Sequence, residues 1–316
     1  MRRAFAGAIL AATVLLASCL HGWTKAKPST AKPVPKATAL VCTFEPTHRG
    51  TAPEIAVVAG PLAGKGWLRS ERAGGLMRTG DRLSLYAMET GAIGALVVTG
   101  RAEWEQDGTS YGLLYAVRED MPADKRQPYD AAVRRRTTKD VWLRTPHLLA
   151  AWSASGRQPR WVRGETVKPD DAAYRSIISN WLAKRGAPWD VRASVEVDQI
   201  VRADINGDGR AEVFLSFHTP NAVQGFMSPT WHARATKRHF SHLVMRWAPS
   251  RGERVSTLVI DDNINSGKRV HGFCDLDGDG WAEIVISSDL FEGYKVDLLH
   301  WHHGRFARII GWGAAD

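Results

Sequence analysis

Cysteine is scarce in this chain, which has three such residues among 316. A small scaffold held together by many disulfides is therefore excluded. A long apolar run is also missing, because the run at residues 4–16 is too short to span a bilayer durably. The chain has no convincing Gly-x-Ser-x-Gly motif, Ser-x-x-Lys start or cysteine nucleophile. We therefore predict that the protein is not an enzyme.

A concentrated positive charge is lacking as well, although the formal net charge is +9. Six cationic side chains lie in an N-terminal stretch without acids: Arg2, Arg3, Lys25, Lys27, Lys32 and Lys36. The rest of the chain is only weakly basic. The sequence thus lacks the basic stripe of a nucleic-acid-binding protein, and we expect no nucleic acid partner.

The N-terminus has the parts of a secretory signal: two arginines, the apolar run and small residues after it. Residues 16–19 read Leu-Ala-Ser-Cys and resemble the lipobox of bacterial lipoproteins. The resemblance implies that residues 1–18 are removed and that Cys19 carries lipid, including palmitate, which anchors the protein in the cell envelope. Leu20 stands where aspartate would signal inner-membrane retention, which favours the outer membrane. The alternatives are an uncleaved signal anchor and a secretory signal without lipid.

The next two segments differ in composition. Residues 19–40 are rich in Lys, Pro, Ala and Thr, which predicts a flexible tether. Residues 41–169 contain short runs of Val, Leu, Ile and Tyr between turn signals, which predicts a β-rich domain of antiparallel strands. The predicted strands are 54–60, 82–88, 95–100 and 111–117. Asp107 and Gly108 predict a hairpin turn between 102–105 and 111–115. The charged stretch 124–140 predicts a solvated loop or a short helix.

One helix is expected, at residues 171–185. Pro169 and Asp170 supply its start signals, and Gly186 and Pro188 its stop signals. Its apolar residues recur with helical spacing, which indicates a face packed against the core. We expect this helix, within a connector at 170–194, to link the N-terminal domain to the rest of the chain.

A nine-residue phrase occurs twice, at 204–212 (the first loop) and at 275–283 (the second loop). Positions one, three, five and nine carry oxygen-bearing side chains: Asp204, Asn206, Asp208 and Glu212, and Asp275, Asp277, Asp279 and Glu283. Oxygen ligands suit Ca²⁺, and the glycine at position six permits the sharp turn of a loop that wraps around the ion. Position twelve holds Leu215 or Ile286 within a β-like run, so neither loop is an EF-hand.

Each loop lies in a unit of four predicted strands, and the two units fill residues 195–316. The first unit has strands at 201–205, 213–217, 243–247 and 255–260, and the second at 272–276, 284–287, 297–301 and 306–310. Both predict an antiparallel meander of the kind that forms a propeller blade. We therefore predict a mainly β protein: an N-terminal antiparallel β domain, one linking α-helix and a C-terminal pair of blade-like β-meanders with calcium loops.

The doubled unit resembles the FG-GAP and VCBS repeats, the calcium-loop blades of integrin α-subunits and of many bacterial surface proteins. The resemblance implies that the eight side chains above ligate Ca²⁺, together with the backbone carbonyls of Arg210 and Trp281. Phe-Gly and Gly-Ala-Pro residues of the family are missing, and two blades are too few to close a propeller. Three arrangements stay open: degenerate blades from the N-terminal strands, a sandwich-like pair, or a dimer.

Two groups of residues leave alternatives. Cys42 and Cys274 could form a disulfide in an oxidising compartment, but Cys274 aligns with Ala203 of the first unit, which favours a buried free thiol. Histidines collect at 232, 239 and 242 and at 300, 302 and 303. They could form a zinc or copper site if the repeats face each other, although histidines at the surface or at a strand edge are favoured. Strand alternation would place His300 and His302 on one face and Trp301 on the other.

These features predict a calcium-binding, lipid-anchored envelope protein that acts as a binding, adhesion or scaffold module. Trp281 in the second loop is a candidate platform for a protein or glycan partner. Trp231, in the long loop between the predicted strands 213–217 and 243–247, is another. The alternatives are an extracytoplasmic hydrolase with a structural calcium ion and a purely structural envelope protein.

Overall fold

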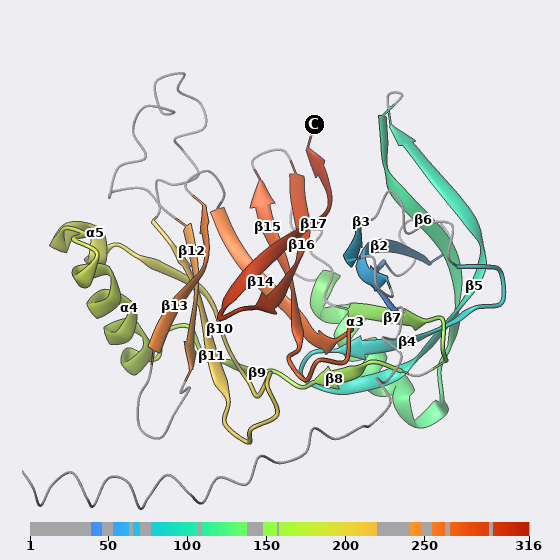
Figure 1. The fold of residues 1–316 in the computed structure, drawn as a ribbon, viewed down its shortest axis with the longest axis horizontal. Coiled ribbons are helices and arrows are strands. Elements are labelled where there is room, and N and C mark those ends of the chain that lie inside the picture. Colours follow the sequence, from blue (N-terminus) through green and yellow to red (C-terminus); the bar gives the residue numbers. More distant parts are fainter. Residues whose placement is uncertain are drawn as a thin grey trace, which may run out of the picture. The chain divides into compact units, whose positions relative to one another are not determined.

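A computed structural model describes residues 39–45, 53–62, 66–69, 77–106, 109–137, 148–156, 158–219, 241–247, 255–262, 266–290 and 293–315. As predicted, the protein is mainly β, with antiparallel sheets (Figure 1). Within these ranges, no helix is both long and apolar enough to cross a membrane.

The N-terminal strands form a closed barrel. Its strands are β1 (Ala39–Glu45), β2 (Glu54–Leu62), β4 (Arg82–Ala87), β5 (Gly91–Gln106), β6 (Thr109–Asp120) and β7 (Leu148–Ser153). They pair in the order β1-β7-β4-β5-β6-β2, and β1 pairs with β2 to close the ring, while β3 (Gly66–Arg69) extends the sheet from β2. The predicted hairpin is confirmed by the pairing of Gln106 with Thr109; its two turn residues lie outside the described ranges. None of the described barrel strands forms a propeller blade.

Strand β1 shows how alternation assigns the two faces of the barrel wall. Leu40 and Phe44 belong to the barrel core, whereas Ala39 and Val41 belong to a second core outside the barrel. Ala39 and Leu40 are both fully buried. Residues 39 and 40, predicted to belong to the tether, are therefore part of the barrel, because these apolar side chains have packing partners on both sides of the sheet.

The C-terminal part consists of two five-stranded sheets. The first sheet has the order β13-β12-β11-β10-β9 and the second β17-β16-β15-β14-β8. The strands of the first are β9 (Glu165–Val167), β10 (Glu196–Ala203), β11 (Glu212–His218), β12 (Ser241–Trp247) and β13 (Val255–Asp262). Those of the second are β8 (Arg160–Val162), β14 (Ser266–Asp275), β15 (Glu283–Leu290), β16 (Gly293–His302) and β17 (Arg305–Ala315). Both predicted meanders are thus confirmed. Strands β8 and β9, which we had placed in the N-terminal domain, add a fifth strand to each.

The two sheets stack in the same sense, as consecutive blades do. Phe214 of the first sheet packs against Phe273 of the second, with ring centroids 5.1 Å apart. The residue equivalent to Phe214 in the second sheet is Val285, which faces away from the first sheet and packs against the barrel. Equivalent faces therefore point in the same direction. The pair forms a two-layer stack, which is the second of the three arrangements left open by the sequence.

Helices cover the free face of the first sheet. Helix α4 (Ala172–Lys184) begins after Asp171, whose carboxylate accepts a hydrogen bond from the Ala173 N–H at 2.9 Å. Its Ile178 and Leu182, with Val191 of α5 (Trp189–Ala193), pack against the first sheet. The predicted helix is confirmed, and its described buried residues pack on α5 and the first sheet rather than on the barrel. The helices and the barrel thus cover the two ends of the stack.

The charged stretch 124–140 contains η1 (Ala123–Lys125) and the short helix α3 (Arg126–Thr137), in line with one of the two predicted states. Tyr129 is its buried residue and packs against Phe44 of the barrel core, with centroids 6.4 Å apart. Its hydroxyl donates a hydrogen bond to Glu119. One aromatic side chain therefore anchors a helix that is rich in charged residues.

The two described cysteines are free thiols. Cys42 points into the barrel core, whereas Cys274 lies in the core between the barrel and the second sheet. Both are buried, and burial raises the pKa of each thiol. The favoured prediction of a buried free thiol is confirmed, since the barrel wall separates the two side chains.

Candidate functional site

The two loops occupy equivalent places, between β10 and β11 and between β14 and β15. Glycines at positions four and six have positive φ in both: 73° at Gly207, 83° at Gly209, 76° at Gly278 and 97° at Gly280. Other residues rarely adopt this conformation. The two loops therefore share one backbone shape, and the glycine predicted to be needed at position six is needed in both.

Backbone N–H groups hold the ligand side chains in the same way in both loops. The N–H of position four donates to the position-one carboxylate at 2.8 Å in each copy. The N–H of position five donates to the side-chain oxygen of position three, at 3.0 and 3.1 Å. The N–H of position seven, Arg210 or Trp281, donates to the position-five carboxylate at 2.8 Å. These bonds turn the side chains of positions one, three and five toward the loop backbone and fix them there.

The position-nine glutamates are the most buried ligand candidates. Glu212 is 2% exposed and Glu283 is fully buried. One oxygen of each accepts a hydrogen bond from the N–H of position two, from Ile205 at 3.0 Å and from Leu276 at 2.7 Å. Burial raises the pKa of both carboxyl groups to about 7. A bound cation would offset the cost of keeping these buried groups ionised.

The second oxygen of each glutamate has a different partner. The Glu283 Oε1 lies 2.9 Å from Nδ1 of His300 on β16. In the first loop, Asn206 donates to Glu212 at 3.4 Å. Arg246 lies opposite Val213 and Leu299 lies opposite Ile284, so the position equivalent to His300 is Trp247. Burial lowers the pKa of His300, but the hydrogen bond to Glu283 and the neighbouring acids outweigh burial and raise it overall. The two loops thus share a backbone but differ in the side chains around position nine.

Arg160 and one backbone hydrogen bond join the two loops. The Ile205 carbonyl accepts from the Ala282 N–H at 2.8 Å and from the Arg160 guanidinium at 3.3 Å. Arg160 also donates to the Gly280 carbonyl at 2.8 Å and lies 3.5 Å from the Asp275 carboxylate. The loops therefore form one connected unit at one end of the stack. Sequence reasoning missed Arg160, because this residue begins β8, is distant from both loops along the chain and belongs to no motif.

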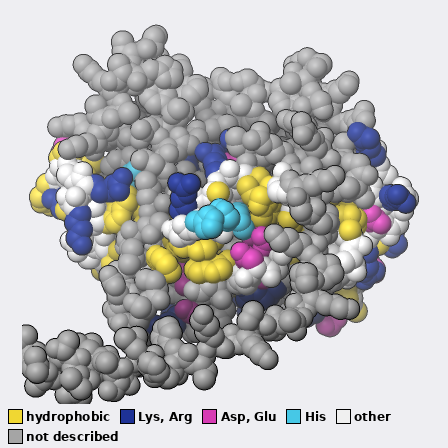
Figure 2. Space-filling view, viewed as in Figure 1, with side chains coloured by type: hydrophobic (Ala, Val, Ile, Leu, Met, Phe, Trp, Pro, Cys, Tyr) yellow, Lys and Arg dark blue, Asp and Glu magenta, His cyan; other side chains and the backbone are white. Residues whose placement is uncertain are grey.

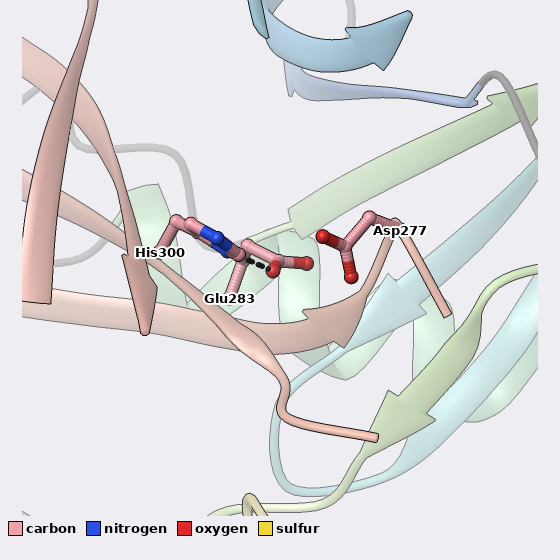
Figure 3. Close-up of side chains that lie close together, drawn as sticks. All are labelled: Asp277, Glu283 and His300. Carbon is pink, nitrogen blue, oxygen red and sulfur yellow. Dashed lines mark hydrogen bonds and ion pairs between the residues drawn. The ribbon is translucent and has the colours of Figure 1, made fainter. Parts of the chain in front are cut away.

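All ten predicted ligand residues lie in the described loops. The structure brings together carboxylates of Asp275, Asp277 and Asp279, whose ligand atoms lie within 4.8 Å of one another. A second set, Asp277, Glu283 and His300, satisfies the same limit (Figure 3). The first loop, which the structure describes throughout, has no such carboxylate or histidine set, since its position three is the amide Asn206. His300 joins the site although we predicted it to be a surface residue.

The described histidines of the two groups do not assemble across the repeats. His242 packs against Trp181 of α4, with centroids 5.3 Å apart, whereas His300 packs against Trp67 of β3 at 4.9 Å. His300 and His302 stack at 5.7 Å on one face of β16, as the alternation predicted. Figure 2 shows histidine side chains beside acidic and apolar ones, where Figure 1 draws the C-terminal strands. Histidines 232 and 239, Trp231 and Cys19 lie outside the described residues.

Trp281 belongs to an aromatic cluster. Its ring stacks on Trp301 with centroids 4.8 Å apart and an interplanar angle of 16°, and Trp247 meets both rings edge-on. Trp281 stays half-buried at the edge of the core shared by the two sheets. Internal packing therefore occupies one face of the Trp281 ring. The predicted partner platform would use the other face.

A cavity of about 410 Å³ lies away from both loops. Its lining comes from the β4–β5 turn, α3, β9, β10 and β14 and includes Glu89, Arg269 and His271. The Nε2 of His271 lies 2.8 Å from the hydroxyl of Ser287. Ser287 is fully buried, so this pair does not present a serine nucleophile to a substrate in the cavity.

No family model matches the chain, and no curated protein or solved structure is significantly similar to it. The resemblance to FG-GAP and VCBS repeats, like the resemblance to lipoproteins, therefore stays a prediction made from the quoted motifs.

Proposed function

We propose that the protein is a calcium-binding, lipid-anchored envelope protein that acts as a binding, adhesion or scaffold module. One observation carries the proposal. Two loops with the same backbone shape and four backbone-to-side-chain hydrogen bonds in common lie side by side, joined by the bond from Ala282 to Ile205. A cation in each loop would stiffen this end of the two-sheet stack. The other edges of the two sheets would then be available to a partner.

The residues fit calcium chemically. Side-chain oxygens dominate both loops, and hard cations with oxygen ligands bind such sets. Positions one, three, five and nine would hold the ion, with the carbonyls of Arg210 and Trp281 as further ligands. The ion would supply positive charge next to the buried glutamates and no reaction chemistry. We expect affinities in the weak extracellular range, with Kd on the order of 0.1–1 mM.

Calorimetric titration of single variants tests this assignment. Glu212→Gln and Glu283→Gln keep the shape of the side chain and remove its charge. Each variant is expected to lose one of two calcium ions. The site that remains in Glu212→Gln is expected to bind more tightly than the one that remains in Glu283→Gln, because the second loop has four carboxylates and the first has three and an amide. An unchanged stoichiometry in both variants would refute calcium binding by these loops.

The cavity supports a second candidate, the binding of a small ligand. Its volume lies in the range of ligand pockets, and apolar residues such as Met88 and Val270 line it beside Arg269. Because the His271–Ser287 pair is buried, we favour ligand binding over hydrolysis there. Thermal-shift screening of small carboxylates against the chain and Arg269→Ala tests this candidate, since a shift that needs Arg269 would place the ligand in the cavity.

A further inference from the structure

We infer that the second loop contains a mixed nitrogen–oxygen metal site, formed by Asp277, Glu283 and His300, that binds a divalent transition-metal ion such as Zn²⁺. The inference deepens the proposed function and rests on it in one respect, namely that the second loop holds a divalent cation. It adds a second class of ion and a residue from outside the nine-residue phrase.

The geometry of the three side chains supports the site. Each offers one ligand atom, and the three atoms lie within 4.8 Å of one another. The His300 imidazole reaches the loop from β16, and its Nδ1 lies 2.9 Å from the Glu283 carboxylate (Figure 3). Glu283 is fully buried and His300 is 8% exposed. An imidazole nitrogen and two carboxylates thus lie close together, with Glu283 and His300 buried and Asp277 half-buried.

The ligand types select the class of ion. Imidazole suits zinc and its neighbours in the first transition series, whereas calcium takes oxygen ligands. With bonds of about 2.0–2.1 Å, the ligand atoms of a tetrahedral zinc site lie about 3.3 Å apart. Nδ1 and Oε1 therefore need to separate by only a few tenths of an ångström, and the ion takes the place of the proton between them.

The two ligand sets of the second loop overlap at Asp277. The all-oxygen set is Asp275, Asp277 and Asp279, and the mixed set is Asp277, Glu283 and His300. Because Asp277 belongs to both and Glu283 is expected to ligate calcium as well, one ion excludes the other. Calcium and zinc are therefore expected to compete for the second loop.

The first loop is an internal control. It has the same backbone and the same glutamate at position nine, but Trp247 replaces the imidazole and Asn206 replaces the position-three acid. The indole N–H of tryptophan is a hydrogen-bond donor only and offers no lone pair to a metal. We therefore expect the first loop to take calcium alone.

Neighbouring groups hold the mixed site in place. The Trp67 ring packs on the His300 ring with centroids 4.9 Å apart, and the Leu276 N–H fixes the other oxygen of Glu283 at 2.7 Å. Such contacts orient metal ligands and contribute to affinity.

The test is a zinc titration in calcium-free buffer. It compares the full chains of the wild type, His300→Asn and His302→Asn. Asparagine keeps a donor near the position of Nδ1 and removes the imidazole ligand. The wild type is expected to bind one zinc ion in this buffer and to release it when calcium is then added, and His300→Asn is expected to weaken zinc binding by at least about tenfold. Cobalt added as a probe should give visible absorption bands of a low-coordinate site in the wild type and lose them in His300→Asn.

His302→Asn is the matched control, because this exposed imidazole lies two residues along the same face of β16. It is expected to leave the zinc site intact. Equal zinc affinity in the wild type and His300→Asn overturns the inference, as does an equal loss in both variants, which would place zinc on surface histidines. A calcium ion retained in the first loop shows that His300→Asn is folded. If the first loop of the wild type binds no calcium, the proposed function fails. The zinc titration still tests the inference, because zinc is expected in the second loop alone.

Discussion

Calcium is expected to raise the melting temperature of the wild-type chain by on the order of 10 °C, and to leave that of the Glu212→Gln/Glu283→Gln double variant unchanged. At 10 mM calcium and the affinities proposed above, each site contributes about 1.4–2.7 kcal/mol of stability. For a chain of this size, 1 kcal/mol corresponds to about 2–4 °C. Differential scanning calorimetry at pH 8, with calcium or with a chelator, measures the difference.

The chelated state provides the control for this comparison. Because burial raises the pKa of both glutamates to about 7, their ionised forms destabilise the ion-free fold at pH 8. The neutral double variant is therefore expected to melt no lower than the wild type in chelator. A double variant that still gains as much as the wild type from calcium would place the bound ion elsewhere.

Replacement of Phe214 by alanine is expected to lower the free energy of unfolding by about 3–5 kcal/mol, the usual loss for a buried phenylalanine. Phe214 is 1% exposed and packs on Phe273 between the two stacked sheets. The substitution would leave a cavity at the centre of the interface between the two sheets. The helices cover the outer face of the first sheet, and the barrel covers that of the second. Urea unfolding at saturating calcium measures the loss.

Phe306→Ala is the matched control for that variant. Phe306 is half-buried at the edge of the same core. Its ring packs against the Trp301 ring, with centroids 4.9 Å apart. Its truncation is expected to cost less than half of the loss in Phe214→Ala. Similar losses in the two variants would show that the stacked interface does not contribute the main part of the stability.

Local sequence patterns predicted the C-terminal architecture well. The alternation of apolar residues located all eight strands of the meanders, and the glycine at position six, predicted to permit the sharp turn, has positive φ in both loops. The start and stop signals placed α4 within one residue at each end. These features depend on residues close in sequence, so one chain is enough to find them.

The remaining features depend on contacts between distant segments. Strands β8 and β9 have three residues each, too few for a periodic signal, and they become strands only because β14 and β10 offer free edges. Arg160 contacts the second loop across 120 residues. His300 read as a surface residue because nothing near it in sequence indicates that β16 delivers it to Glu283. Pairing partners, and not composition, decide these positions.

The arrangement also explains how two blades suffice without a ring. The stack leaves one free face on each sheet, and these faces need apolar cover. Leu182 and its neighbours in α4 and α5 cover the first sheet, and Val41 and other residues outside the barrel core cover the second. The helices and the barrel thus act as caps, which short repeat arrays need in order to bury their terminal faces.

Hydrogen–deuterium exchange of the wild-type full chain, with and without calcium, tests calcium binding at the paired loops most directly. Calcium is expected to slow exchange of the amides at 204–212 and at 275–283, since those N–H groups hold the ligand side chains. Exchange in strand β5 of the barrel, which has no part in the loops, is expected to stay the same. Unchanged exchange in both loops at 10 mM calcium would contradict calcium binding there.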